Sequence, residues 1–368
     1  MAIKGYAIEP NYATPPGATL KEVLAEKMMT QTDLAQRVGL TTKTISKIVN
    51  GTAPLSPETA SNLEIVLGVP ASFWNNLEIS FRANLEEKRK QEEISKQIEF
   101  IKCSPYNEMA KVGLVEKTKD NMEKVSNLLR FFGCATVDIL QNQINDNKVL
   151  AGAYRGSATA EVDKLALYAW IRKGELLANQ IDTEEFDKVK AKAQVSELRS
   201  LTNEINPSVF IPKLQEICAS FGVAVVFVPE VKGSRVCGLT RWLTPHPKAI
   251  IQLSLRYKTN DSLWFTFFHE LGHIIKHSKQ PFYTFKKGYV ESSMEIEANA
   301  FASNTLIPAV EYETFIEKGI FSRESIVEFA RDISIHPGIV VGRLQNDKHL
   351  EWRNLTDLKS RYSWEFSE

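Results

Sequence analysis

Residues 264–277 read WFTFFHELGHIIKH, so a run of bulky, mostly apolar residues leads directly into a histidine and a glutamate. A second histidine follows four places after the first. On a helix, four steps of about 100° bring His269 and His273 to within about 40° of each other, one turn apart on the same face. Two imidazole nitrogens placed in this way can bind one zinc ion at about 2.0–2.1 Å. The stretch therefore predicts a helix with a metal site on one face.

The glutamate beside the first histidine has a different predicted role. Glu270 lies about 100° around the helix from His269, which is too far to complete the same ligand set but close enough to reach a water on the metal. Zinc lowers the pKa of such a water, and a carboxylate can take its proton and later deliver it to a leaving amine. Glu270 is therefore the candidate general base of a zinc peptidase.

The residues around the motif predict a buried and rigid helix. Asp261 or Ser262 is expected to cap a helix that starts near Leu263, and Gly272 is expected to let a neighbouring strand approach the backbone closely. Aromatic side chains bury the helix and keep the local dielectric constant low. These side chains are Trp264, Phe265, Phe267 and Phe268.

Two histidines need a third protein ligand, and the sequence offers several candidates. A third histidine ten residues after the first is excluded, because Lys279 occupies that position. His277 lies about 80° away from the first histidine around the helix, so we expect it beside the site or on the surface. Glu295 is the preferred ligand, Glu291 is a weaker substitute, and Glu297 points about 200° away from Glu295. Small residues on the face of Glu295 would let its helix press against the histidine helix: Ala298, Asn299 and Ala302.

A second stretch, residues 31–50 (QTDLAQRVGLTTKTISKIVN), has the pattern of a helix-turn-helix. The small residue Ala35 stands where two helices would cross, and Gly39 can take the positive φ that the turn requires. Thr41 is placed to cap the second helix. Apolar residues face inward at five positions, Leu34, Val38, Leu40, Ile45 and Ile48.

The outward face of this predicted motif carries side chains suited to DNA. Short or cationic donors on the second helix suit base edges and phosphates of the major groove, and polar residues on the first helix can hold the DNA backbone. The first 80 residues hold six Lys or Arg against seven Asp or Glu, so a monomer would bind weakly and we expect a homodimer on a two-fold operator. The candidate DNA contacts are Gln31, Arg37, Thr42, Lys43, Thr44, Lys47 and Asn50.

Composition limits the class of protein. The 368 residues are 43% hydrophobic and 24% charged, which is typical of soluble globular proteins with two or three domains. No segment approaches the ~18 apolar residues of a membrane span, and the first residues lack the apolar core of a signal peptide. We therefore expect a cytoplasmic protein with no membrane partner. Four cysteines stand far apart without a CxxC pair, which favours free thiols.

The chain divides by pattern into three predicted regions. Residues 1–80 contain short amphipathic helices with Thr, Ser or Pro near their starts and Gly at several ends, and they form the predicted DNA-binding domain. Residues 81–209 read as a charged connecting helix followed by further helices. In residues 210–368, short β-branched runs from Val223 onward predict strands, followed by the histidine helix and a helical subdomain. The expected fold class is α+β, mostly helical, with one small sheet covered by helices.

The C-terminal motifs resemble those of the ImmA/IrrE-type metallopeptidase family. The likeness covers roughly residues 210–355 and rests on three segments in order, WFTFFHELGHIIKH, EIEANAFASNTLIP and ISIHPGIVVGRLQNDKHL. The resemblance implies a zinc-dependent, gluzincin-like endopeptidase with His269, His273 and Glu295 as ligands and Glu270 as base. Members of this family typically cleave a partner transcriptional repressor and so release stress or mobile-element genes. The segment SNTLIP departs from the usual Ala-rich, Leu-Met-Pro ending, which affects no catalytic position.

The N-terminal stretch from PGATLKEVLAEKMMTQTDLAQRVGL to LGVPASFWNNLEISFR resembles the XRE-type repressor fold. More narrowly, it is similar to the HigA-type antitoxins of toxin–antitoxin pairs, and VNGTAPLSPETASNLEIVLGVPASFWNNLE carries most of that likeness. The resemblance implies autorepression of the protein's own operon and, in many members, capture of a small RNA-cleaving toxin. No motif for contact with a toxin can be carried over.

Three functions fit these patterns. The first is a DNA-binding transcriptional regulator with its own zinc endopeptidase, whose protein substrate is a repressor, a toxin or another copy of the chain. The second is an antitoxin-like autorepressor in which the zinc domain senses or binds a ligand without proteolysis. The third is a metallopeptidase whose N-terminal domain contacts proteins and not DNA. The first is preferred.

Overall fold

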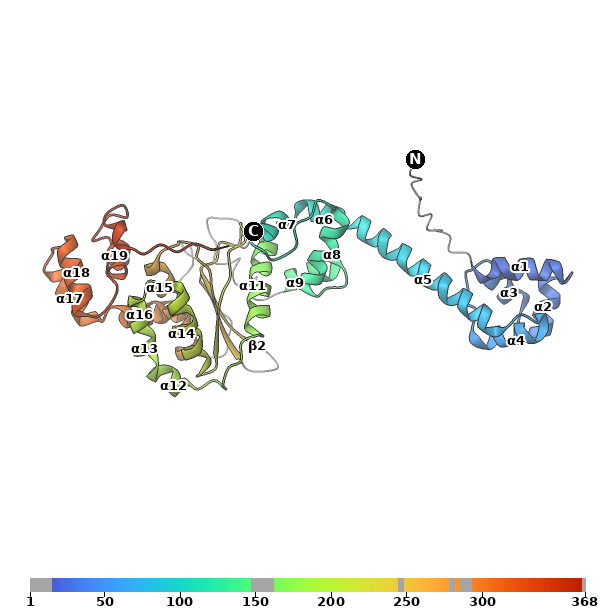
Figure 1. Cartoon of the computed structure of the whole chain (residues 1–368), viewed down its shortest axis with the longest axis horizontal. Helices are drawn as coiled ribbons and strands as arrows, with labels where there is room; N and C mark the ends of the chain where they lie inside the picture. The colour runs from blue at the N-terminus through green and yellow to red at the C-terminus, as the bar shows by residue number, and fades with distance from the viewer. Residues whose placement is uncertain (1–14, 147–161, 244–247, 278–281, 285–292, 366–368) are drawn as a thin grey trace, which may run out of the picture. The chain divides into compact units, whose positions relative to one another are not determined.

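The contacts within the chain divide it into two compact units, Met1–Ile98 and Glu99–Glu368. Each unit has its own hydrophobic core. The predicted fold class is confirmed: the chain is α+β and mostly helical, with an all-α N-terminal domain and a small sheet in the C-terminal region. The parts described by the computed structural model (Figure 1) are residues 15–146, 162–243, 248–277, 282–284 and 293–365.

The described part of the N-terminal unit is helical. A Cβ atom on Gly17 would stand 2.2 Å from the backbone oxygen of Val49, so the first and third helices cross at a distance that only glycine allows. Trp74 is fully buried in the same core. The helices are α1 (Pro16–Glu26), α2 (Gln31–Val38), α3 (Thr42–Val49), α4 (Pro57–Leu67) and α5 (Ala71–Lys96).

The helix-turn-helix stretch has the local structure that its sequence predicts. Thr30 begins α2 in a capping box with Asp33. Thr41 caps α3, because its side chain accepts a hydrogen bond from the backbone N–H of Thr44 at 3.1 Å. Between the helices, Gly39 has a φ of 71°, a left-handed conformation that costs glycine little. The predicted inward residues are buried or half-buried.

The C-terminal unit is built on a four-stranded sheet of order β1-β3-β2-β4. Strand β1 runs parallel to β3, whereas β2 is antiparallel to both of its neighbours. Runs of apolar and β-branched residues suit this sheet, because both of its faces are covered. The strands are β1 (Val223–Phe227), β2 (Gly238–Leu243), β3 (Lys248–Leu253) and β4 (Phe282–Thr284).

Helices cover both faces of this sheet (Figure 1). On one face, helix α11 (Lys164–Ala178) packs closely: the side-chain amide of Gln252 in β3 donates a hydrogen bond to the backbone oxygen of Trp170 at 2.7 Å. Gly174 makes room for that amide, since a Cβ there would overlap it. On the other face lie α14 (Pro207–Ala219) and the histidine helix α15 (Asn260–Lys276).

The other elements of this unit flank the sheet and its two helix layers. Helices α12 (Lys188–Ala193) and α13 (Val195–Ser200) belong to the predicted middle region, and they contact the histidine helix α15 and α16 (Ser293–Leu306), respectively. Arg199 of α13 donates hydrogen bonds to the backbone oxygens of Leu306 and Ile333 at 3.0 Å and 2.7 Å. These elements are α6 (Ile98–Cys103), α7 (Tyr106–Lys111), α8 (Asn121–Phe132), α9 (Val137–Asp146), α12 (Lys188–Ala193), α13 (Val195–Ser200), η1 (Leu201–Asn203), α16 (Ser293–Leu306), α17 (Ala309–Glu317), α18 (Arg323–Asp332), α19 (Pro337–Asn346) and η2 (Thr356–Leu358).

Two details predicted for the histidine helix are wrong. The helix starts at Asn260, three residues before the expected start, and its N-cap residue Thr259 makes no side-chain capping bond. The carboxylate of Asp261 instead accepts a hydrogen bond from Lys359 Nζ at 2.7 Å, so the chain end fastens this turn. Gly272 gives close approach to a helix and not to a strand, because a Cβ there would stand 3.0 Å from Phe301 of α16.

Within the described ranges, we find no helical segment with the length and hydropathy that a bilayer crossing requires.

Candidate metal centre and candidate DNA interface

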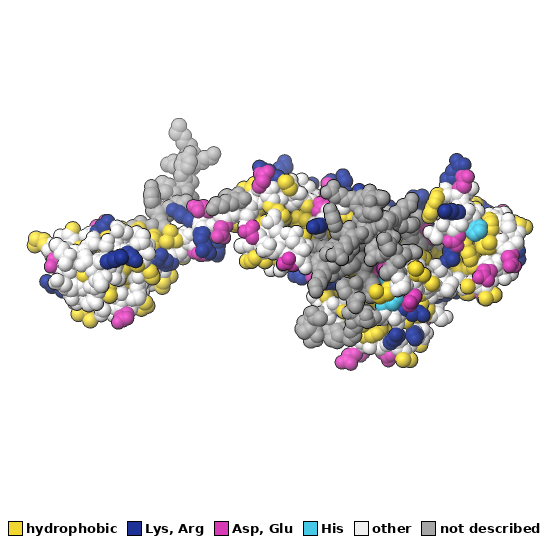
Figure 2. All heavy atoms as spheres, turned by 180° about the vertical axis from the view of Figure 1, so that it is seen from behind, with side chains coloured by type: hydrophobic (Ala, Val, Ile, Leu, Met, Phe, Trp, Pro, Cys, Tyr) yellow, Lys and Arg dark blue, Asp and Glu magenta, His cyan; other side chains and the backbone are white. Residues whose placement is uncertain are grey.

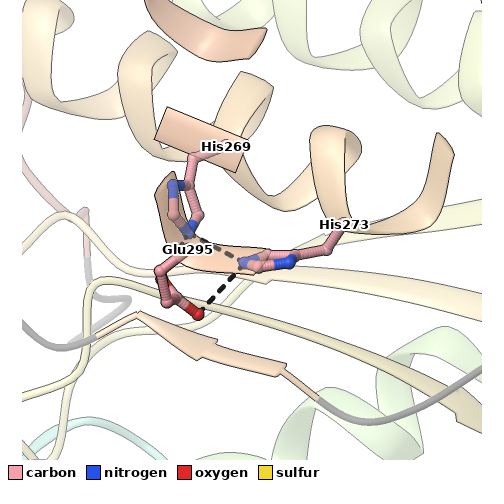
Figure 3. Close-up of side chains that lie close together, drawn as sticks. All are labelled: His269, His273 and Glu295. Atoms are coloured by element: carbon pink, nitrogen blue, oxygen red, sulfur yellow. Dashed lines mark hydrogen bonds and ion pairs between the residues drawn. The ribbon is translucent and has the colours of Figure 1, made fainter. Parts of the chain in front are cut away.

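Three side chains from two helices converge on one point (Figure 3). His269 and His273 come from α15, and their Nε2 atoms are 3.0 Å apart. Glu295 comes from the first turn of α16. Its Oε2 lies 3.3 Å from His269 Nε2, and its Oε1 lies 3.4 Å from His273 Nε2. The i, i+4 spacing predicted this pairing of imidazoles, and α16 brings the carboxylate to it.

The spacing of these atoms fits a tetrahedral metal ion. Ligand atoms at about 2.0–2.1 Å from zinc stand about 3.3 Å from one another, which is close to all three separations. Two imidazoles and one carboxylate are also the donor set of catalytic zinc sites, in which the fourth position stays open. Among the described residues, this is the one cluster of His, Cys, Asp or Glu close enough to hold a metal ion.

The charges in the cluster favour an ionised carboxylate. Burial raises the pKa of Glu295, but its hydrogen bonds and charge interactions with both imidazoles outweigh burial and bring the pKa to about 2. Burial lowers the pKa of His269, whereas its hydrogen bond to Glu295 and the nearby carboxylates raise it more, so the net pKa is raised. The pKa of Glu295 is therefore lowered and that of His269 raised, which are the directions expected when a carboxylate lies beside an imidazole.

The first imidazole is oriented from α16. His269 Nδ1 lies 2.9 Å from Asn299 Oδ1. An amide oxygen accepts a hydrogen bond, so Nδ1 carries the proton and the Nε2 lone pair faces the cluster. Sequence reasoning placed Asn299 on the correct face of α16 but only as a small packing residue. The signal that could have found it is its i+4 spacing from Glu295.

Glu270 follows His269 on α15 and is fully buried. Its Oε2 accepts a hydrogen bond from the Thr240 hydroxyl of β2 at 2.7 Å. Gly238, two residues earlier on the same strand, leaves space for the carboxylate, since a Cβ there would stand 2.8 Å from Glu270 Oε1. Sequence reasoning missed both β2 residues, because nothing local to the strand marks it as a neighbour of this glutamate.

Two other ligand candidates, His277 and Glu297, lie outside the ligand set. His277 Nδ1 is 3.0 Å from His273 Nδ1, on the side of that ring opposite the cluster. Glu297 is exposed, and its Oε2 lies 3.5 Å from His277 Nε2. Glu291 falls outside the described residues. Glu295 can reach the histidines because Ala298 and Ala302, both fully buried, let α16 press against α15.

The predicted DNA contacts form a mostly exposed group on α2 and α3. Thr42, Lys43 and Lys47 on α3 are exposed, and Arg37 on α2 is exposed as well. Figure 2 shows Lys and Arg side chains in separate small groups on one face of this unit, among uncharged and acidic side chains. This distribution agrees with the neutral local charge.

The other three predicted DNA contacts are placed less simply. Thr44 is half-buried, and its hydroxyl lies 2.9 Å from that of Thr41, so it takes part in the cap of α3. Asn50 is exposed but follows the last residue of α3 as its C-cap. Gln31 is half-buried at the start of α2. Thr44 and Gln31 are therefore less free to reach DNA than the exposed lysines.

Family comparisons agree with both local structures. Residues 20–74 match a family model described as helix-turn-helix, and residues 218–344 match a peptidase family model described as an IrrE N-terminal-like domain. The chain joins an XRE-type helix-turn-helix domain to a metallopeptidase-type domain. The helix-turn-helix domain contains α2 and α3, and the metallopeptidase-type domain contains the sheet, α15 and α16.

Two solved structures each match about a quarter of the chain. One is an addiction module antidote protein of the HigA family from Coxiella burnetii, with 26% identity, a TM-score of 0.21, and coverage of 23% of this chain and 94% of that one. Another is a protein assigned as the antidote of a plasmid maintenance system from Nostoc punctiforme, with 22% identity, a TM-score of 0.22, and coverage of 23% and 91%. No curated protein matches the chain.

Proposed function

We propose that this protein is a DNA-binding transcriptional regulator whose second domain is a zinc-dependent endopeptidase that cleaves a regulatory protein such as a repressor. One observation carries the proposal: His269, His273 and Glu295 converge at tetrahedral spacing while Glu270 lies buried beside them. A base next to an open metal site is the arrangement that peptide hydrolysis needs.

His269, His273 and Glu295 would hold the zinc ion. When bound, zinc polarises the scissile carbonyl and activates water as a Lewis acid. Glu270 is the general base: its carboxylate takes a proton from the attacking water and delivers it to the nitrogen of the leaving amine. The Thr240 hydroxyl fixes one oxygen of that carboxylate. Because Glu270 is fully buried, bulk water does not compete for these contacts.

The helix-turn-helix domain would place α3 in the major groove of an operator. The exposed side chains of Lys43 and Lys47 suit phosphates or base edges, and Thr42 suits base edges. With nearly balanced charge in this domain, a second copy on a two-fold operator would supply the missing affinity. Operator DNA, a protein substrate and a second copy of the chain are therefore the proposed partners.

The decisive experiment compares the wild type with Glu270→Gln. We expect the variant to keep one zinc per chain by elemental analysis and to lose about 10²–10⁴-fold in peptide hydrolysis, the usual contribution of a general base. New protein N-termini in cells that express each form would identify the substrate. Glu313→Gln, an exposed carboxylate on α17, is the matched control and should behave as wild type.

The same comparison separates the competing functions. Wild-type protein that contains no zinc, or Glu270→Gln protein that still cleaves, contradicts the peptidase proposal. If Glu270→Gln changes nothing in cells while Lys43→Ala with Lys47→Ala derepresses transcription, the protein is a repressor with a ligand-binding zinc domain. If the lysine changes leave operator binding unaltered at low salt, the helix-turn-helix domain contacts proteins instead.

A further inference from the structure

We propose that His277 is the positioning residue of the ligand His273, and that Glu297 holds His277 in turn. This inference rests on the proposed zinc site and assigns a role to two residues outside the ligand set. It concerns how the second imidazole is held, because the first already has Asn299 as its partner.

The contacts form a chain that leads away from the cluster. His273 Nδ1 lies 3.0 Å from His277 Nδ1, and the two rings have their centroids 5.1 Å apart with an angle of 49° between their planes. On its other side, His277 Nε2 lies 3.5 Å from Glu297 Oε2. The His277 side chain is only 6% exposed, so the residue is packed against the site and is not a loose surface group.

Proton positions along this chain can be assigned from chemistry. His273 Nε2 faces His269 and Glu295, and a metal ligand must offer a lone pair there. A neutral imidazole then carries its proton on Nδ1, which must donate to an acceptor. His277 Nδ1 is that acceptor, so a neutral His277 carries its own proton on Nε2, the nitrogen that faces the Glu297 carboxylate.

The spacing of the two histidines at the end of α15 accounts for their contact. His277 is the C-cap residue, with extended backbone angles, and its N–H still donates to the His273 backbone oxygen at 3.1 Å. His277 stands four residues after His273, and residues at this spacing are neighbours on one helix face. Helix α16 thereby supplies Asn299 to one imidazole and Glu297, through His277, to the other.

Zinc affinity tests the inference without any need for a substrate. We expect His277→Ala to bind zinc about 10–100-fold more weakly than wild type, which is the usual cost of removing such an outer partner. His277→Asn, whose amide oxygen can replace the Nδ1 acceptor, should recover most of that loss. Glu297→Gln should lose less than His277→Ala, because the carboxylate is 60% exposed. His349→Ala, an exposed histidine elsewhere in the unit, is the control.

Competition between the protein and a chromophoric zinc chelator gives the affinities, and thermal unfolding of the zinc-free forms monitors the fold. Absorption of the cobalt-substituted proteins reports ligand geometry, which a purely structural role would leave unchanged. His277→Ala with wild-type affinity, or His277→Asn as weak as His277→Ala, overturns the inference. If Glu297→Gln binds zinc with wild-type affinity, the role proposed for Glu297 is wrong and the role of His277 stands.

The outcomes also separate this inference from the proposed function. If wild-type protein takes up zinc but cleaves nothing, the peptidase proposal fails, and the affinities still decide the role of His277. If wild-type protein takes up no zinc, the proposed site fails and this inference with it. If the wild type binds zinc and hydrolyses peptides, but His277→Ala has the zinc affinity and the cobalt absorption of the wild type, only the inference about His277 fails.

Discussion

Helices α3 and α15 both carry the candidate functional side chains of their domains, but they hold those side chains differently. On α3, Lys43 and Lys47 are exposed and extend from the surface. On α15, His269 and Glu270 are buried, and each is held by a residue from another element, Asn299 of α16 and Thr240 of β2. A side chain that contacts the charged DNA backbone needs only to be exposed on the surface. A side chain that transfers protons must be held in place by neighbouring residues.

This difference predicts that small changes in residues that support α15, outside the ligand set, lower function more than changes on α3. Gly238→Ala should lower peptide hydrolysis about 100-fold, because a 1 Å displacement of a catalytic group can have that cost. The added Cβ would overlap Glu270 Oε1 and Thr266 Cγ2. Both are ends of side chains that can shift, so the fold should survive. Hydrolysis assays and zinc content measured on the same sample check this prediction.

Gly272→Ala is the informative partner of that variant. Its Cβ would press on Phe301 and on the Ala298 backbone in α16, so it should weaken zinc binding, whereas Gly238→Ala should not. Equal zinc loss in both variants would show that the two glycines do not separate the base from the ligand set.

Thr240→Val should have the next largest effect. It removes the hydroxyl that donates to Glu270 at nearly constant volume, and a hydrogen bond to a charged group contributes about 1.5–3 kcal/mol. We expect kcat to fall by about tenfold or more, with little change in KM or zinc content. Thr240→Ser keeps the hydroxyl and should retain most of the activity. A serine variant as slow as the valine variant would assign Thr240 a packing role.

Changes on α3 should be smaller and governed by salt. Lys43→Ala and Lys47→Ala should each weaken operator binding at all sequences to a similar extent and reduce the slope of log affinity against log salt by about one. Lys21→Ala, an exposed lysine on α1, is the control. Binding titrations over a range of salt concentrations make the measurement. A strong sequence-dependent loss would instead assign base contacts to these lysines.

The smallest predicted effect is a pH dependence confined to the metal cluster. The pKa of Glu295 falls from its usual 4.5 to about 2 in the fold, so its stabilisation is complete above pH 4.5 and is lost as the pH falls toward 2. The pKa of His269 is raised from its usual 6.5, so its stabilisation is complete below pH 6.5 and is lost as the pH rises through the raised value.

The unfolding temperature of zinc-free protein should therefore be highest at a pH between the acidic loss from Glu295 and the basic loss from His269, with the cluster contributing to that maximum. Glu295→Gln should remove the acidic loss, because an amide does not titrate there, and it should flatten the basic side as well. An unchanged pH profile in this variant would show that the ion pair contributes nothing measurable to stability.

The parts that could be predicted from sequence are those set by local spacing. The i, i+4 histidines, the positive φ of Gly39 and the Thr41 cap all depend on residues within a turn of one another. The start of α15 could not be predicted, because Lys359 binds Asp261 from 98 residues away and the chain end holds that turn. Gly272 was assigned to the wrong neighbour for a similar reason, since no pattern shows which element packs on a helix.

By itself, the sequence determined which residues could share a helix face, where the turn and the cap of the helix-turn-helix fall, and that two helical motifs of different chemistry lie on one chain. Only the tertiary structure decided which groups support them: Asn299 and Thr240 each reach α15 from 30 residues away. By contrast, His277 and His273 are neighbours through their i, i+4 spacing on α15. Periodicity fixes direction around a helix axis, whereas the partner of a side chain depends on how separate elements pack.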